Sequence, residues 1–195
     1  MKSLIVTAVL SVAALASAEI KPLMAGEPIP AATLKTADGT DFELQEAIAK
    51  HPTILIFYRG GWCPYCNRHL AALQELDPQL RELGYQIIAI SPDRPSELAK
   101  STDAGHLTYT LLSDSSMEAA SAFGLAFTVD DATIEKYKGY NIDLEAASGE
   151  SHHKLPVPAV FIVGTDGVID FAHANEDYKK RIEPDVLLSA AKAAQ

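Results

Sequence analysis

The sequence predicts an α/β domain in which a mixed β-sheet is flanked by helices. Residues 53–58 form a continuous apolar run, and a helical periodicity and a second buried strand follow. This order is that of a parallel strand–helix–strand unit with a right-handed crossover. Residues 159–172 instead contain two short strands around Thr165–Gly167, the pattern of an antiparallel hairpin. Parallel and antiparallel pairings within one chain indicate a mixed sheet.

The elements are expected in a simple order along the chain. Asp38–Gly39 signals a hairpin turn, Gly84 a helix end, and Pro184 the first position of a helix. Residues 125–155 are mixed and polar, and we expect a long functional loop or insertion there. The other expected elements are an extended lead-in over 19–30, a hairpin over 33–42, helices over 44–50, 64–83, 96–101, 116–123 and 184–194, and strands over 53–58, 85–90, 108–112, 159–163 and 168–172.

The composition is that of a globular protein. The chain has 195 residues, of which 48% are hydrophobic and 22% charged, with a net charge of −10 and two cysteines. These values exclude a disordered, collagen-like or disulfide-dense protein. The acidic balance argues against nucleic-acid or anionic-membrane partners, because both bind clustered Lys and Arg. No Pro/Gly/Ser-rich linker divides the chain, so one domain is predicted.

The first eighteen residues are typical of a signal peptide. Lys2 gives a positive start, Leu4–Leu15 is uncharged and mostly apolar, and Ala16–Ala18 has the small-x-small form of a cleavage site. A buried N-terminal helix and an uncleaved anchor are the alternatives. We expect residues 1–18 to be removed and 19–195 to be an exported domain, periplasmic or secreted, without stable membrane association. An oxidising compartment would leave the cysteine pair as a disulfide at rest.

The two cysteines form a CxxC pair at the start of the helix expected after the first core strand. Cys63 falls at the N-cap, Pro64 takes the first helical position, and Cys66 lies one turn further on. A thiolate at a helix N-terminus faces unpaired N–H groups and the positive end of the helix dipole. We therefore expect Cys63 to have a lowered pKa and to attack, and Cys66 to have a higher pKa and to resolve.

Three other interpretations of the pair are open. A structural disulfide would close a very small loop and add little stability. A zinc site needs four ligands, of which His152 and His153 would have to supply the missing ones. A Cu(I)-binding module would need two thiolates and one of these histidines folded over Cys63. The isolated histidines His51, His69, His106 and His173 are expected to be surface or core residues.

The motif resembles the active site of the thioredoxin-like superfamily. Trp62–Cys66 combines the tryptophan that precedes the pair in thioredoxins with the Pro64-Tyr65 centre of glutaredoxins. Residues 155–161 resemble the loop before the late strand of that fold, which implies a cis Val157–Pro158 peptide against the cysteines. An ordinary trans proline that opens a strand is the alternative for Pro158.

More specifically, residues 25–190 resemble the peroxiredoxin-like AhpC/TSA family. The resemblance rests on the lead-in, the Asp38–Gly39 hairpin, Phe57–Cys63 and Ile88–Asp93. Ile56 and Gly60 stand where the family has a proline and the threonine that helps to hold the peroxide. Arg59 is a candidate for supplying positive charge to the site. The sequence gives Arg181 less weight, because it matches no family position.

The resemblance implies a thiol-based antioxidant oxidoreductase. Cys63 would reduce a hydroperoxide and become a sulfenic acid, Cys66 would resolve it, and a thioredoxin-like donor would re-reduce the disulfide. The alternatives are thiol–disulfide exchange on exported proteins and the Cu(I)-binding module. No metal, flavin or nucleotide cofactor is implied, since the sequence has no Gly-rich phosphate loop.

Overall fold

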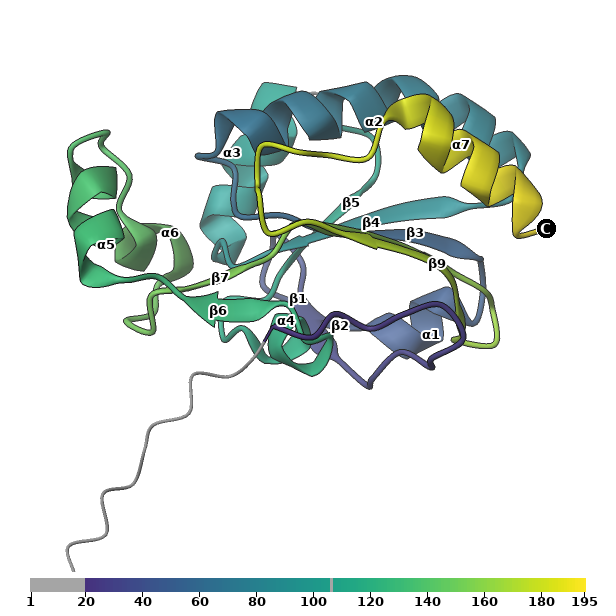
Figure 1. Ribbon diagram of the computed structural model, residues 1–195, viewed down its shortest axis with the longest axis horizontal. Helices are drawn as coiled ribbons and strands as arrows, with labels where there is room; N and C mark the ends of the chain where they lie inside the picture. Colours follow the sequence, from purple (N-terminus) through teal and green to yellow (C-terminus); the bar gives the residue numbers. More distant parts are fainter. Residues whose placement is uncertain (1–19, 106) are drawn as a thin grey trace, which may run out of the picture.

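The fold is a seven-stranded mixed sheet with helices on both faces, seen in a computed structural model that describes residues 20–105 and 107–195 (Figure 1). The strand order is β2-β1-β5-β4-β3-β8-β9. β3, β4 and β5 are parallel, whereas β1, β8 and β9 are antiparallel to their neighbours. The parallel pair β3–β4 and the antiparallel hairpin β8–β9 are those that the sequence predicts. The strands are β1 Thr33–Lys35, β2 Asp41–Glu43, β3 Thr53–Phe57, β4 Gln86–Ser91, β5 Thr110–Ser113, β8 Ala159–Val163 and β9 Ile169–Ala174.

The central strand β3 explains the continuous apolar run in the sequence. β3 lies between β4 and β8, and all five of its residues are buried. Ile54 and Ile56 belong to the core on one face of the sheet, and Leu55 and Phe57 to the core on the other. Because successive side chains of a strand point to opposite faces, a strand covered on both sides is apolar at every position.

Helices cover the two faces unequally. α2, α3 and α7 lie on the face that carries Ile54 and Ile56, and α1 and α4 lie on the other (Figure 1). Gly84 follows α2 with φ +86°, the left-handed conformation expected at a helix end. The predicted elements outside 125–155 are present, and their ends differ from the prediction by a few residues. The helices are α1 Leu44–Ile48, α2 Pro64–Glu82, α3 Pro95–Gly105, α4 Glu118–Ala122 and α7 Pro184–Ala193.

Of the two expectations for 125–155, a long functional loop or an insertion, the long loop is wrong. The segment contains β6 Ala126–Thr128, α5 Asp131–Lys138, α6 Leu144–Ser148 and β7 Lys154–Pro156, and β6 pairs with β7. We call residues 129–153, which include α5 and α6, the α5–α6 module. It lies at one end of the main sheet (Figure 1).

Two features give the module its structure despite its polarity. Asp130 and Asp143 are N-caps that accept hydrogen bonds from the backbone N–H groups of Thr133 and Ala146, at 2.9 and 3.0 Å. A small core of Val129, Ile134, Leu144 and Leu155 packs beside Trp62. These few apolar residues suffice for two short helices.

The predicted signal segment, residues 1–18, and His106 lie outside the described residues. Within the described ranges, none of the helices is long and apolar enough to cross a membrane.

Candidate active site

The loop between β3 and α2 contains two glycines at which a Cβ would collide with neighbouring side chains. Gly60 has φ +137°, and a Cβ there would lie 2.4 Å from Nε1 of Trp62. A Cβ at Gly61 would lie 2.0 Å from Oγ of Ser101 on α3. The double glycine, which in the sequence marks only the end of a strand, therefore lets the backbone approach both neighbours and delivers Cys63 to the start of α2.

Cys63 is the N-cap residue of α2 and Pro64 the first residue of the helix, as predicted. The Cys63 carbonyl accepts the first helical hydrogen bond, from the N–H of Asn67 at 3.0 Å. Both cysteines are free thiols and both are buried, with Cys63 only 1% exposed. The pair lies where the positive end of the α2 dipole meets the sheet.

The two thiols differ strongly in acidity. The pKa of Cys63 is lowered from 9.0 to about 6, chiefly because the Cys66 thiol donates a hydrogen bond to it, against the opposing effect of burial. The N–H of Cys66 and the charges of Arg59 and Arg181 contribute further. Burial, and donation to Cys63, raise the pKa of Cys66. The structure thus pairs a sulfur that is mostly thiolate at neutral pH with one that stays protonated, as the sequence predicts.

Arg59 is buried beside the pair rather than solvated at the strand end. It is 3% exposed, and its guanidinium carbon lies 4.1 Å from the centroid of the Tyr178 ring. The rings of Trp62 and Tyr137 are also near, at 5.4 and 5.6 Å, and Nη2 of Arg59 donates a hydrogen bond to the Tyr137 hydroxyl. In the described part of the chain, no carboxylate forms an ion pair with Arg59. The positive charge of Arg59 instead stabilises the Cys63 thiolate and helps to lower the pKa of Cys63.

Arg181 is the second cation of the site, although it was a weaker candidate than Arg59 in the sequence analysis. Its Nη2 donates to Sγ of Cys66 at 3.2 Å, and its Nε donates to the carbonyl of Tyr178 at 2.9 Å. Arg181 lies 115 residues after Cys66, in the segment before α7. Only the packing of that segment against α2 reveals the contact.

Asp93, which follows β4, lies behind the glycine loop and was not among the predicted site residues. It is 1% exposed, and its Oδ2 accepts hydrogen bonds from the N–H of Gly61 at 2.7 Å and from Oγ of Ser91 at 3.0 Å. Burial raises its pKa from 3.8 to about 6, and the nearby negative charge of Cys63 adds to the rise. Asp93 thus holds the loop in place and opposes the charge on Cys63.

The chain is similar to proteins of a known family. The model of the AhpC/TSA family matches residues 25–172. The chain belongs to the AhpC/TSA family. Rv2521 of Mycobacterium tuberculosis, which is named a peroxiredoxin, is 33% identical over 102 residues, which are 52% of this chain and 64% of that protein. Peroxiredoxin Bcp of Escherichia coli K12 is 26% identical over 175 residues, which are 87% of this chain and 96% of Bcp.

Solved structures agree on the thioredoxin-like fold. Peroxidoxin BcpB of M. tuberculosis superposes with a TM-score of 0.69 at 18% identity, over 89% of this chain and 99% of that one. Reduced Prx3 of Vibrio vulnificus, in complex with H₂O₂, gives a TM-score of 0.70 at 18% identity, over 87% and 99%. The chain covers 64% of the length of the mycobacterial sequence relative, less than two thirds.

The structure explains one departure from the AhpC/TSA pattern. Gly60 stands where the family has a threonine, and no side chain fits there. Ile56, in the place of the family's proline, is fully buried in β3. The Gly60 position therefore has no threonine hydroxyl.

The predicted cis peptide at Pro158 is wrong. No cis peptide bond occurs among the described residues, so Val157–Pro158 is trans. The chain continues directly from β7 into β8, and the N–H of Val157 donates to the carbonyl of Leu125 at 2.8 Å. A trans bond suits this path and is favoured by about 0.5–1 kcal/mol before proline. Pro158 nevertheless lines a cavity of about 280 Å³ together with Arg59 and Tyr178.

Tyr65 and Trp62, which belong to the Trp62–Cys66 motif, contact different neighbours. The Tyr65 ring contacts the Tyr178 ring edge-on, with centroids 5.6 Å apart. Trp62 and Gly61 line a larger groove of about 530 Å³ between α2, α3 and α6. Leu70, Ile142 and Ala147 give this groove apolar walls.

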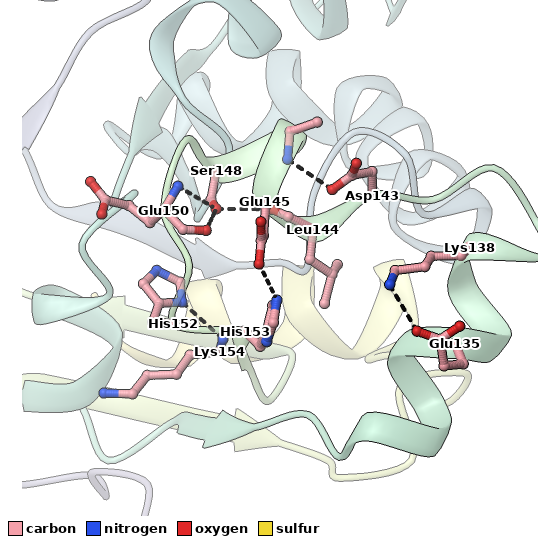
Figure 2. Close-up of polar contacts among 11 residues, drawn as sticks. Glu135, Lys138, Asp143, Leu144, Glu145, Ser148, Glu150, His152, His153 and Lys154 are labelled. Atoms are coloured by element: carbon pink, nitrogen blue, oxygen red, sulfur yellow. Dashed lines mark hydrogen bonds and ion pairs between the residues drawn. The ribbon is translucent and has the colours of Figure 1, made fainter.

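Both histidines of the pair contact residues other than the cysteines, and Figure 2 shows the contacts with Glu145 and Lys154. Nε2 of His153 contacts Oε1 of Glu145 at 2.7 Å, and His152 contacts the carbonyl of Ser115 and the N–H of Lys154, at 2.7 and 2.9 Å. Among the described residues, no three His, Cys, Asp or Glu side chains are grouped to hold a metal ion. The zinc and copper interpretations thus have no support from the geometry.

Proposed function

We propose that this protein is a thiol peroxidase that reduces hydroperoxides with Cys63 and resolves with Cys66. Its membership of the AhpC/TSA family supports the class of reaction. The observation that carries the proposal is the combination in Cys63 of a pKa near 6 with almost complete burial. A sulfur that is charged but 1% exposed suits a small substrate better than a disulfide on the surface of a folded protein.

The proposed reaction has two steps. The Cys63 thiolate attacks the terminal oxygen of the hydroperoxide; an S–O bond forms, the O–O bond breaks, the terminal oxygen keeps its proton, and the alkoxide leaves and takes a proton from water to become the alcohol. Cys63 is then a sulfenic acid. The Cys66 sulfur next attacks the Cys63 sulfur; an S–S bond forms, the S–O bond breaks, and hydroxide leaves as water with the Cys66 proton. A dithiol donor of the thioredoxin type returns two electrons and restores both thiols.

The site residues have separate tasks in this scheme. Arg59 and the N-terminus of α2 stabilise the Cys63 thiolate. Arg181 donates to Cys66 Sγ at 3.2 Å, which favours the anionic form of the resolving sulfur as it attacks. The Cys66 thiol, while still protonated, donates to Cys63 and so serves both steps.

The test is to trap the first intermediate. Peroxide treatment of the Cys66→Ser variant should leave one oxygen on Cys63, detected by mass spectrometry and by a sulfenic-acid probe. The Cys63→Ser variant is the matched control and should gain none at Cys66. A Cys63 that reacts with hydrogen peroxide no faster than a free thiol would contradict the proposal.

Thiol–disulfide exchange on exported proteins is the second candidate. The specific observation in its favour is Gly60, which leaves the site without the family's peroxide-holding hydroxyl. Insulin reduction measured beside stopped-flow oxidation by hydrogen peroxide separates the two functions. Fast insulin reduction with slow peroxide oxidation would favour exchange.

We further propose export, on the sequence of residues 1–18 alone. N-terminal sequencing of the protein from the periplasm or medium should begin at Glu19. Retention of Met1 on the exported form would contradict cleavage at Ala18.

A further inference from the structure

Tyr137 on α5 reaches the site from outside the main sheet. Its hydroxyl accepts a hydrogen bond from Nη2 of Arg59. Its ring centroid lies 5.7 Å from that of Trp62, the residue before Cys63. A residue of the α5–α6 module, which is not part of the seven-stranded sheet, thus contacts two residues of the cysteine loop.

Arg59 depends on such contacts, because its charge is buried without a carboxylate. Its Nε has no hydrogen-bond partner, and its guanidinium carbon is placed among the rings of Tyr178, Trp62 and Tyr137. Ring faces attract a cation but fix its direction weakly. A hydrogen bond is directional, so the Tyr137 hydroxyl is the contact that orients the fork of Arg59.

The module holds Tyr137 firmly enough for this task. Asp130 caps α5 at its start, and Ile134, one turn before Tyr137, is buried in the small core of the module. The contact of His153 with Glu145 ties α6 to the turn before β7 (Figure 2). The position of the Tyr137 side chain is therefore set by packing and capping within the module.

We propose that Tyr137 is a positioning residue, whose hydroxyl and ring hold the Arg59 guanidinium beside Cys63 so that the α5–α6 module completes the thiol site. The inference deepens the proposed function, since it rests on Cys63 as the reacting sulfur. The positioning role is tested by measuring the ionisation of Cys63, which does not require peroxide turnover. The positioning role and the proposed peroxidase function can therefore be refuted independently.

The first experiment compares Tyr137→Phe with Tyr140→Phe. Tyr140 lies just after the end of α5, is 65% exposed, and serves as the matched control. The rate of Cys63 alkylation is measured against pH by mass spectrometry. Tyr137→Phe keeps the ring contact with Trp62, so we expect an unchanged melting temperature. Below the inflection, we expect an alkylation rate roughly two- to tenfold lower than in the parent, the range that one hydrogen bond provides. Tyr140→Phe should match the parent.

A double-mutant cycle decides whether Tyr137 acts through Arg59. In an Arg59→Met background, adding Tyr137→Phe should leave the alkylation profile unchanged. An equal shift with and without Arg59 would overturn the proposal, because the hydroxyl would then act on Cys63 by another route. An unshifted profile in the single Tyr137→Phe variant would overturn it as well.

A second variant covers the case in which Tyr137→Phe does not fold. Asp130→Ala removes the cap of α5 and leaves Arg59, Trp62 and Tyr137 unaltered. Hydrogen exchange should show faster opening of α5, and the inflection of Cys63 alkylation should move to higher pH. A loosened α5 with an unmoved inflection would refute the positioning role.

Discussion

The sharpest prediction concerns the Cys66→Ala substitution, which removes the cysteine that we propose as the resolving one. The Cys66 thiol is the largest single cause of the low pKa of Cys63, because its S–H donates to the thiolate. Cys66 is therefore expected to stabilise the Cys63 thiolate before any disulfide forms. Removing the thiol should make Cys63 a weaker acid even in the fully reduced protein.

The size of the effect follows from the pKa values. A fall from 9.0 to about 6 corresponds to about 4 kcal/mol of thiolate stabilisation, from all sources together. A hydrogen bond to a charged group contributes about 1.5–3 kcal/mol, which is roughly one to two pKa units. We expect the alkylation pKa of Cys63 to be about 7–8 in Cys66→Ala. The thiolate fraction at pH 6 should then fall from about one half to about one tenth or less.

The assay is the rate of Cys63 alkylation by iodoacetamide as a function of pH, checked by the ultraviolet absorbance of the thiolate. Cys66→Ser keeps a hydroxyl donor and is the matched variant, so its inflection should lie between the parent and Cys66→Ala. Equal inflections in all three proteins would refute the argument that the Cys66 thiol supports the charge. An inflection that moves to lower pH would refute its sign.

Three further predictions follow from contacts in and around the site. Arg181→Met removes the donor to Cys66 Sγ, so conversion of the sulfenic acid to the disulfide should slow by roughly tenfold; stopped-flow fluorescence of the single tryptophan measures it, and an unchanged rate would contradict the role. Gly61→Ala places a Cβ 2.0 Å from Oγ of Ser101 and should destabilise the fold by about 1–3 kcal/mol in urea unfolding; Ser101→Ala should recover most of the loss, and failure to do so would show that the clash is elsewhere. Asp93 has a folded pKa of about 6 against 3.8, so its protonated form adds stability at low pH that is lost as pH rises from about 4 through 6. Relative to Asp93→Asn, which keeps an oxygen for the Gly61 N–H, the parent should lose up to about 3 kcal/mol over that window, and parallel stability curves would exclude the effect.

The parts of the fold that the sequence predicts are those specified by local pattern. The apolar run of β3, the proline after Cys63 and the glycine after α2 each act within a few residues. Strand burial, helix capping and the polarity of the α2 dipole follow from such neighbours alone. The direction of the acidity difference between Cys63 and Cys66 was predicted from the start of the helix, although its largest cause is the hydrogen bond that the Cys66 thiol donates to Cys63.

The contacts that complete the site depend on tertiary structure. Arg181 meets Cys66 across 115 residues, and Tyr137 meets Arg59 across 78. No periodicity or spacing signals these contacts, because they arise from the packing of separate segments. No local sequence pattern marks Asp93 as a site residue, because its contribution is the hydrogen bond that it accepts from the N–H of Gly61 on the neighbouring loop.

The α5–α6 module was missed although signals were present. Asp130 and Asp143 are N-caps of short helices, a pattern that the sequence displays. The few apolar residues of the module bury themselves against Trp62 of the cysteine loop, so its hydrophobic pattern is incomplete when the segment is considered alone. The prediction of a cis Val157–Pro158 peptide bond was wrong for a different reason. It rested on the resemblance to the thioredoxin-like superfamily, and the local path of the backbone does not require a cis bond.

The same charge arrangement that activates Cys63 also favours the reduced pair. At pH 7 a thiol of pKa about 6 is about 90% ionised, whereas one of pKa 9 is about 1% ionised. The difference stabilises the dithiol by about 1.4 kcal/mol relative to the disulfide, equivalent to about 30 mV for two electrons. Oxidation removes the thiolate and leaves Arg59 buried without its counter-charge, which works in the same direction. In the proposed reaction, the features that favour attack by Cys63 would therefore also make the disulfide easier for a dithiol donor to reduce, so one arrangement of charges would serve both attack and recycling.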